Sequence, residues 1–493
     1  MGVSLLLASA SLATGGAVSA AAASPRAQIS AATASRAIKR AENLLDGRAH
    51  GQRPRELTFT LLRLARALPR LSRPQRARAK ALLARPTDAE DPGGSSYTVP
   101  EAPPACSAHF CVHYVATSAD APNLGDGNAN GVPDYVDQVI ATAEQAYATE
   151  NGTLGWQAPE PDGNRGGDNR TDIYLSELRG ELFGYATTDP GQGNDRSQFA
   201  YLVLDNDYSS SEFPGTVPVQ VLEVTLAHEY NHILQFGYDV FQELWFLESS
   251  AVWMEDRVFG SIDDYFRYVR VWTKLSKLPL TFDNIKVYGS AVWLHWLAGR
   301  YGPGVVLGAW ERARGSKPVG FSLKTLERSV AAAGGLKLAR EFARFAAATA
   351  EWRTPGVFPY VDAPLYPDMK RRGKLHAGQF VKRRLSHLGF LLMRVRPRHV
   401  RRIRLLAGAG KGTKSAFALV CRIGSVAAGK VVIKLKFAKR GGIRAVRLRR
   451  PGRCSRITAV LVNADPRQGG FFFGDWLYRH DREPFAATLV LKR

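Results

Sequence analysis

The chain has 493 residues, 45% of them hydrophobic and 23% charged, which excludes an intrinsically disordered protein and predicts two or three domains. Its formal net charge is +23, with basic residues crowded into 26–85 and 370–453 and carboxylates enriched between 120 and 264. No zinc-finger, helix-turn-helix or RNP signature accompanies this charge, so we expect no specific nucleic-acid partner. A basic compositional bias accounts for the charge, and attraction to anionic envelope polymers or lipids is the functional alternative.

Residues 1–23 have the features of a secretory signal peptide, because an apolar run around Leu5 to Leu12 is followed by small residues. The basic region that usually precedes such a run is missing. Gly15, Gly16 and several Ser and Thr residues interrupt the run, so a transmembrane helix is disfavoured. We therefore expect a secreted, extracellular protein.

Residues 24–95 are predicted to form a helical, propeptide-like region with a linker. Between Ala31 and Ala84, apolar and Arg positions alternate at helical spacing, with breaks at Pro69 and Pro74. A Pro/Gly/Ser-rich linker follows over residues 86–104. Two interpretations stay open: a propeptide that is removed or covers a cleft, and a plain N-terminal helical embellishment.

The four cysteines form two local pairs, which suits an exported protein with two disulfides. We expect Cys106 to pair with Cys111 and Cys421 with Cys454. The alternative is four buried thiols. A zinc cluster is disfavoured because neither pair has the C-x2-C spacing.

The central and C-terminal parts differ in pattern. Strand signals at 110–115, 172–175 and 199–204 precede helical periods over 217–314, an α+β order that predicts one domain over residues 105–354. From about residue 383 the alternation becomes β-rich, which predicts a C-terminal β-sandwich over residues 380–493. Its expected strands lie at 388–395, 417–420, 431–437, 457–462 and 486–491.

A calcium-loop pattern opens the central domain. Oxygen donors stand at loop positions 1, 3, 5, 9 and 12, with a backbone carbonyl at 7, glycine at 6 and Asp in place of the usual final Glu. The predicted donors are Asp126, Asn128, Asn130, Val132, Asp134 and Asp137. Calcium would crosslink this loop to the helix beginning near Val136, and the alternative is an Asn/Gly/Asp turn with a helix cap.

The strongest motif is His228-Glu229-Tyr-Asn-His232, in an apolar-periodic helix that we expect to end at Gly237. Residues four apart share one helix face, so His228 and His232 can aim both imidazoles at one zinc ion. Glu229 is placed to take a proton from a water on that ion. The alternative is two ordinary helix histidines beside a surface glutamate.

A catalytic zinc site needs a third protein ligand, and Glu248 is the candidate. It borders a core stripe formed by Leu244, Leu247, Ala251, Met254 and Val258, and a partly buried carboxylate needs a partner. Glu255 and Asp256 are competing donors. We favour them as acceptors for an imidazole N–H, with a solvated helix face as the alternative.

These residues resemble the gluzincin branch of zinc metallopeptidases. The chain is similar, over roughly residues 110–310, to a family of secreted bacterial metalloproteases that also has the Asn-Gly-Val-Pro-Asp-Tyr-Val-Asp segment, here Asn130 to Asp137. The resemblance implies a thermolysin-like fold, Glu229 as the base and Glu248 as the third ligand. Val252 departs from the Asp that the best-known gluzincins have there, so that contact is absent or supplied elsewhere.

The resemblance also suggests an oxyanion donor. In similar gluzincins a tyrosine before a later helix has this role, which here points to Tyr288, with His295 as the other candidate or a core histidine. The apolar strand 199–204 is either an edge that pairs with extended substrate or a core strand. No G-x-M-E-N-type amine-binding segment is present, which favours internal cleavage over aminopeptidase activity.

The sequence thus predicts a secreted, monomeric zinc endopeptidase acting on proteins or peptides, with calcium as a second ion. The alternative is a non-enzymatic protein that binds anionic envelope polymers on a gluzincin scaffold.

Overall fold

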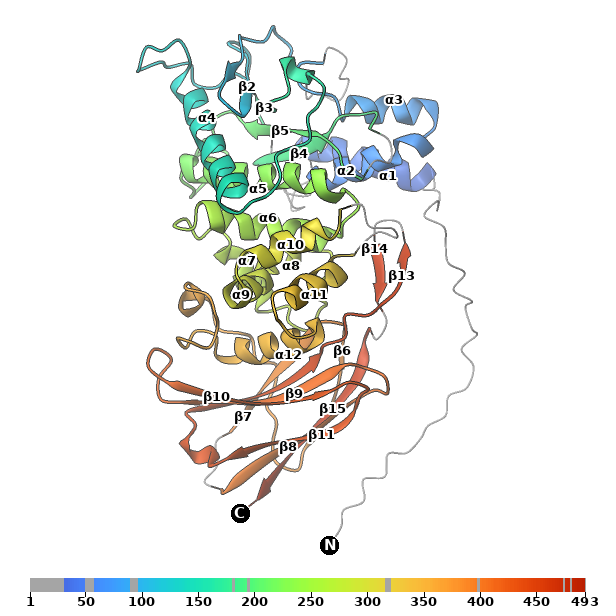
Figure 1. The fold of residues 1–493 in the computed structure, drawn as a ribbon, viewed down its shortest axis with the longest axis vertical. Helices are drawn as coiled ribbons and strands as arrows, with labels where there is room; N and C mark the ends of the chain where they lie inside the picture. The colour runs from blue at the N-terminus through green and yellow to red at the C-terminus, as the bar shows by residue number, and fades with distance from the viewer. Residues whose placement is uncertain are drawn as a thin grey trace.

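A computed structural model describes residues 31–48, 57–88, 96–179, 182–192, 196–314, 321–396, 400–472, 475–478 and 481–492. The predicted signal peptide lies outside these residues. The molecule is elongated, with the N-terminal helices and a mixed sheet at one end, a helical layer in the middle and a β-sandwich at the other end (Figure 1). Within the described part, no helix combines the length and hydropathy needed to cross a bilayer.

Three N-terminal helices pack against the mixed sheet. They are α1 (Ala31–Leu45), α2 (Leu57–Ala67) and α3 (Arg73–Ala81), which agrees with the predicted helical region. Most of their buried apolar side chains form one hydrophobic cluster with Tyr174, Tyr185, Tyr201 and Val203 of the sheet. The N-terminal region therefore shares a core with the central domain.

The mixed sheet has five strands in the order β1-β2-β3-β5-β4. Strands β2, β3 and β5 run parallel, and β4 is an antiparallel edge strand. Of the two alternatives for 199–204, the core strand is correct and the edge is not, because β5 lies between β3 and β4 and is buried throughout. The bounds are β1 (Ala105–Cys106), β2 (Phe110–His113), β3 (Thr171–Ser176), β4 (Gly184–Thr188) and β5 (Ala200–Asp205).

Helix α5 (Pro218–Asp239) and helix α6 (Leu244–Val258) lie on the sheet side of the helical layer (Figure 1). Gly237 does not end α5, contrary to the prediction. The helix continues because Tyr238 packs on Trp156 and Asp239 pairs with Arg196, contacts that outweigh the cost of a helical glycine. The remaining helices are α4 (Asp134–Tyr147), α7 (Phe266–Trp272), α8 (Lys286–Gly289), α9 (Ala291–Tyr301), α10 (Gly304–Glu311), α11 (Ser322–Ala332) and α12 (Leu338–Ala348).

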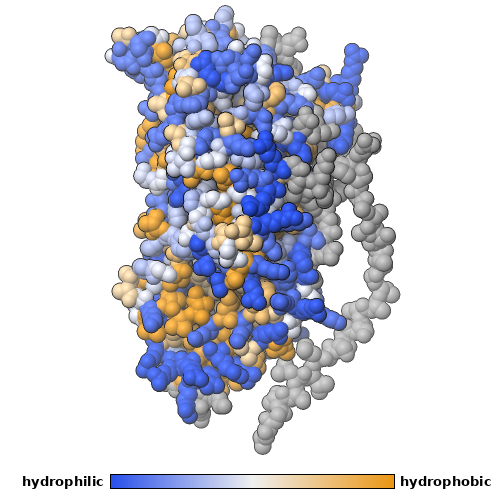
Figure 2. All heavy atoms as spheres, viewed as in Figure 1, coloured by the Kyte–Doolittle hydropathy of each residue, from blue (hydrophilic) through white to orange (hydrophobic). Residues whose placement is uncertain are grey.

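The C-terminal part forms two four-stranded sheets, ordered β10-β9-β12-β7 and β11-β8-β15-β6, which share one hydrophobic cluster. This agrees with the predicted sandwich. Hydrophilic residues cover most of the face in Figure 2, and apolar ones gather toward the sandwich end. The bounds are β6 (Phe380–Leu385), β7 (Gly389–Val395), β8 (Arg402–Ala409), β9 (Ser415–Ile423), β10 (Lys430–Ala438), β11 (Gly442–Arg449), β12 (Arg456–Asn463), β13 (Gln468–Phe472), β14 (Asp475–Tyr478) and β15 (Glu483–Lys492).

Both predicted disulfides are present. Cys106 is bonded to Cys111 across the β1–β2 pair, and Cys421 to Cys454 beside the sandwich core. The alternative of four buried thiols is therefore excluded.

Candidate metal centre

Helix α5 places His228 and His232 one turn apart on a buried face. Both residues are 1% exposed, and their Nε2 atoms lie 3.1 Å apart. The helix forms here because its apolar residues pack on β4, β5 and α6 at helical spacing. The two imidazoles therefore converge as the i, i+4 spacing predicts.

Helix α6 brings the carboxylate of Glu248 to the same point. Its Oε2 lies 3.1 Å from Nε2 of His228 and 3.9 Å from Nε2 of His232. Among the described residues, these three form one of the compact sets of His, Cys, Asp or Glu donors with all donor atoms within 4.8 Å of each other. Helices α5 and α6 thus supply all three predicted zinc donors.

The other ring nitrogens show how the two imidazoles are protonated. Nδ1 of His228 lies 2.6 Å from Oε1 of Glu255, and Nδ1 of His232 lies 2.8 Å from Oε1 of Gln235. The Gln235 amide donates its own hydrogens to Asn231, Leu247 and Ser250, so its oxygen is the acceptor. Each Nδ1 therefore carries a hydrogen, so in the neutral imidazole the lone pair lies on Nε2.

Three lone pairs thus face one small volume, an arrangement that repels itself unless a cation lies between them. Tetrahedral zinc with ligands at about 2.0–2.2 Å would hold neighbouring ligand atoms about 3.3–3.6 Å apart. The three separations of 3.1, 3.1 and 3.9 Å bracket that value. Two imidazole nitrogens and one carboxylate oxygen also match the donor chemistry of catalytic zinc. The residues present fit a zinc ion.

Glu229 follows His228 on α5 and is 3% exposed. Its Oε2 accepts a hydrogen bond of 3.0 Å from Oγ1 of Thr58, on the N-terminal helix α2. The ring of Phe59 meets the ring of His232 edge-on, with centroids 5.3 Å apart. Sequence reasoning missed Thr58 and Phe59, because they lie about 170 residues upstream and no motif marks them.

Tyr288, on the short helix α8, reaches the same cluster. Its hydroxyl donates a 2.8 Å hydrogen bond to Oε1 of Glu248, the oxygen that does not face the histidines. This bond orients the carboxylate so that Oε2 points at the imidazoles. A cavity of about 160 Å³ lies beside Glu248 and Tyr288 and is closed on one side by Phe59.

Glu255 and Asp256, adjacent on α6, have different surroundings. Glu255 is 2% exposed and contacts Nδ1 of His228, the position expected of an acceptor that orients an imidazole. Asp256 instead pairs with Arg257 and Tyr360 and lies 4.0 Å from Nδ1 of His295. Asp256 therefore belongs to another cluster.

His295 is fully buried among Asp256, Tyr265 and Tyr360, and burial lowers its pKa to about 4. Neither ring nitrogen has a hydrogen-bond partner among the described residues. Its surroundings are those of a neutral core histidine.

The predicted calcium loop is an exposed turn that leads into α4. Asp126 accepts hydrogen bonds from the amides of Asn130 and Gly131, and Asp137 accepts from the side chains of Asn128 and Asn130. Asp134 accepts from the amide of Gly127, and the amide of Val132 donates to Asn130. Gly131 has a φ of +85°, which explains the glycine at loop position 6. These contacts order the turn, and calcium binding there stays a prediction.

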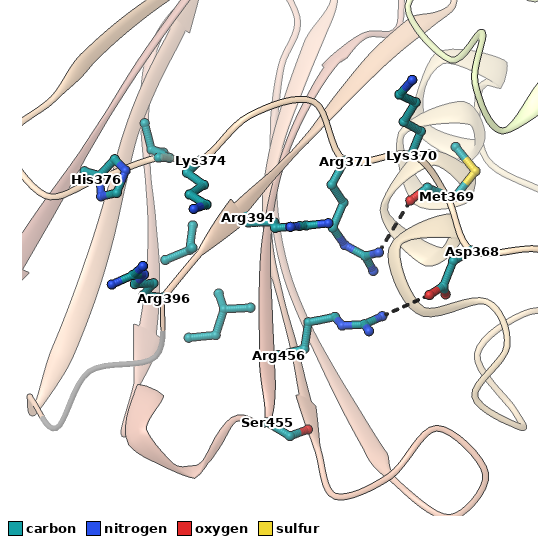
Figure 3. A pocket seen from close by; sticks show the side chains of 13 residues that line it. Asp368, Met369, Lys370, Arg371, Lys374, His376, Arg394, Arg396, Ser455 and Arg456 are labelled. Atoms are coloured by element: carbon teal, nitrogen blue, oxygen red, sulfur yellow. Dashed lines mark hydrogen bonds and ion pairs between the residues drawn. The ribbon is translucent and has the colours of Figure 1, made fainter.

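A larger pocket of about 510 Å³ lies beside the sandwich, where residues 368–376 pass the ends of β7 and β12 (Figure 3). Its described lining includes six Lys or Arg side chains and one carboxylate, Asp368. Arg456 lies 3.8 Å from Asp368, while Arg371 is held deeper by Glu351. The pocket is therefore strongly cationic.

The comparisons with known proteins add no family to this picture. No protein-family model matches the chain, and no curated protein matches it in sequence. The likeness to gluzincins accordingly rests on the motif residues quoted above.

Proposed function

We propose that this protein is a secreted zinc endopeptidase of the gluzincin type. One observation carries the proposal: His228, His232 and Glu248 direct three lone pairs at one point, with Glu229 next to them on α5. Zinc polarises a carbonyl and lowers the pKa of a bound water, which is the chemistry peptide hydrolysis needs. The two disulfides suit an extracellular location.

In this proposal each residue of the site has a separate task. His228 and His232 would hold zinc through Nε2, while Glu255 and Gln235 fix the orientation of the two rings. Glu248 would supply the third ligand, oriented by Tyr288. Glu229 accepts the proton of the attacking water and passes it to the leaving amine. Tyr288 is also the candidate donor to the oxyanion, a role in which its one hydroxyl hydrogen would turn from Glu248 to the substrate oxygen.

The decisive variant is Glu229→Gln, which keeps the side-chain volume and removes the base. We expect peptide hydrolysis to fall by roughly a hundredfold to ten-thousandfold, with one zinc per chain retained. Glu223→Gln is the matched control, because it makes the same change on the same helix away from the site. The secreted chain is assayed intact and after cleavage between residues 88 and 96, because α2 lies against Glu229.

Equal hydrolysis by Glu229→Gln and wild type would contradict the assignment. Absence of zinc from wild-type protein would contradict it as well.

The cationic pocket favours a second candidate, a non-enzymatic protein that binds anionic envelope polymers. Lys374 and Arg394 both line the pocket in Figure 3. If this function holds, Lys374→Gln with Arg394→Gln lowers the salt concentration that elutes the protein from a sulfated polysaccharide column. The control is Lys434→Gln with Arg444→Gln, which removes the same charge from exposed strand positions. It elutes at a higher salt concentration than the pocket variant. Coincident elution would reject the pocket as the binding site.

A further inference from the structure

Helix α2 lies directly on the catalytic residues, and this contact is well packed. Thr58 is 2% exposed, and Phe59 and Leu62 belong to the same hydrophobic cluster as Leu226 and Ile233 of α5. On its other side α2 contributes Leu57, Leu61 and Leu64 to the cluster shared with the mixed sheet. The helix therefore joins two hydrophobic cores beside the proposed zinc ligands His228, His232 and Glu248.

The hydroxyl of Thr58 is fixed by two hydrogen bonds with opposite roles. It donates to Oε2 of Glu229 at 3.0 Å and accepts from the backbone amide of Ala186 at 3.1 Å. A hydroxyl has one hydrogen to donate, so the direction of both bonds is determined. A water molecule between a general base and an edge strand would make the same two bonds.

Both partners of Thr58 are groups that a substrate complex needs. Glu229 must accept a proton from the attacking water, and a carboxylate oxygen bonded to Thr58 is engaged elsewhere. Ala186 lies on β4, the edge strand, whose outward amides would otherwise pair with an extended peptide. Thr58 therefore fills the position between Glu229 and Ala186 that the attacking water and the substrate backbone would take.

The cavity that α2 lines beside Glu248 and Tyr288 is too small for a peptide. The cavity beside Glu248 and Tyr288 measures about 160 Å³, whereas sites for ligands of drug size span roughly 300–1,000 Å³. The ligand residues His228, His232 and Glu248 are each 1% exposed. Peptide binding thus requires α2 to move.

A second contact holds the N-terminal region in place. The guanidinium of Arg85 is 2% exposed and pairs with Asp162, Asp172 and Asp189 of the central domain. Breaking such a buried set leaves uncompensated charges, so spontaneous release is rare. Arg63 adds a more exposed ion pair with Asp283.

From these contacts we infer that the N-terminal helices, residues 31–48 and 57–88, are an internal inhibitor of the catalytic site, with Thr58 as the residue that blocks the base. This inference rests on the proposed peptidase function. The N-terminal region then has an inhibitory activity of its own, and the chain that still carries it is the inactive form of the peptidase. Of the two interpretations of the N-terminal helices, we therefore favour a propeptide that covers the cleft over a plain helical embellishment.

The test substitutes Thr58→Val in the full chain, which removes the hydroxyl at nearly constant volume. Thr142→Val is the matched control, because Thr142 is also 2% exposed and its hydroxyl bonds a backbone carbonyl of α4, away from the site. Two rates are measured: hydrolysis of an unfolded protein substrate, and zinc removal by a bulky chelator. Loss of the two Thr58 bonds predicts that both rates rise roughly tenfold to a hundredfold, while the control matches wild type.

Phe59→Ala is the second variant, used if Thr58→Val does not fold, and both rates are expected to rise for it as well. Unchanged zinc removal and unchanged hydrolysis in folded variants overturn the inference. Faster zinc removal without hydrolysis in any variant supports the covering role of α2 but rejects the peptidase function, so the two failures are distinguishable. Adding Glu229→Gln to Thr58→Val must abolish the gain in hydrolysis and keep the gain in zinc removal.

Discussion

Two buried polar clusters in this molecule contain similar residues but balance their charges differently. The aspartate cluster consists of Asp162, Asp172 and Asp189 around Arg85, with His113 bonded to Asp172. The proposed zinc-ligand cluster consists of His228, His232 and Glu248. In the aspartate cluster, Arg85 and His113 supply the positive charge that balances the carboxylates. In the second cluster, the donor atoms of three side chains lie around one point.

Protonation distinguishes the histidines of the two clusters. Burial alone would lower the pKa of His113, but hydrogen bonds to Asp172 and Glu101 outweigh it and raise the pKa to about 8. Both ring nitrogens of His113 therefore carry hydrogens at neutral pH. His228 and His232 each have one nitrogen engaged with an acceptor and the other directed at a shared point. A buried histidine is a candidate metal ligand when its second nitrogen lies beside the nitrogen of another histidine as well as a carboxylate, as in this pair.

Arg85→Met is expected to have the largest effect on stability. It removes the guanidinium that compensates three buried carboxylates, and breaking a buried set of this kind costs roughly 3–5 kcal/mol. The free energy of unfolding is measured by urea denaturation, with Arg63→Met as control because its ion pair is exposed. Equal losses for the two variants would show that the aspartate cluster is not a structural anchor.

Zinc removal is expected to have the next largest effect. At a free zinc concentration a hundred times the dissociation constant, a single site stabilises the folded chain by about 2.7 kcal/mol, and chelation removes this contribution. Thermal unfolding with and without chelator measures the difference in wild type. The variant His232→Ala should show little dependence on chelator, and a dependence equal to wild type would place the ion elsewhere.

The pKa of His113 predicts a smaller, pH-dependent effect. The folded value of about 8 lies above the ordinary 6.5, so the proton stabilises the folded chain fully below about pH 6.5, and this contribution is lost as the pH rises through 8. The shift corresponds to about 2 kcal/mol. Urea denaturation of wild type and His113→Asn between pH 6 and pH 9 measures it. Parallel pH profiles for the two proteins would contradict the charged state of His113.

Glu255→Gln is expected to have the smallest effect. The variant keeps an oxygen acceptor for Nδ1 of His228 but loses the negative charge, so zinc affinity should fall roughly tenfold. Competition with a zinc indicator measures the affinity. Asp256→Asn is a close control, since Asp256 is the next residue and bonds Tyr360 and Arg257 instead. If both variants bind zinc equally, Glu255 does not orient His228.

Local spacing made part of the site predictable. A helix places residues four apart on one face, so the convergence of His228 and His232 follows from the motif. Glu248 could be proposed because a carboxylate bordering an apolar stripe needs a partner. The two local cysteine pairs likewise predicted both disulfides.

Contacts between distant segments were not predictable from local patterns. Thr58 reaches Glu229 only through packing of α2 on the sheet. Strand β4 was missed because Gly-Tyr-Ala-Thr-Thr is buried at every residue and shows no alternation. Gln235 had a local signal, since it lies three residues after His232 on the same helix, although only its own partners identify its oxygen as the acceptor.

X-ray absorption of the zinc-loaded protein measures the proposed coordination itself. We expect one zinc per chain with nitrogen and oxygen ligands at about 2.0–2.2 Å, including two imidazoles, and loss of this spectrum in His228→Ala. Zinc that fails to bind, or a spectrum unchanged by His228→Ala, would contradict the assignment of His228, His232 and Glu248 as the metal centre.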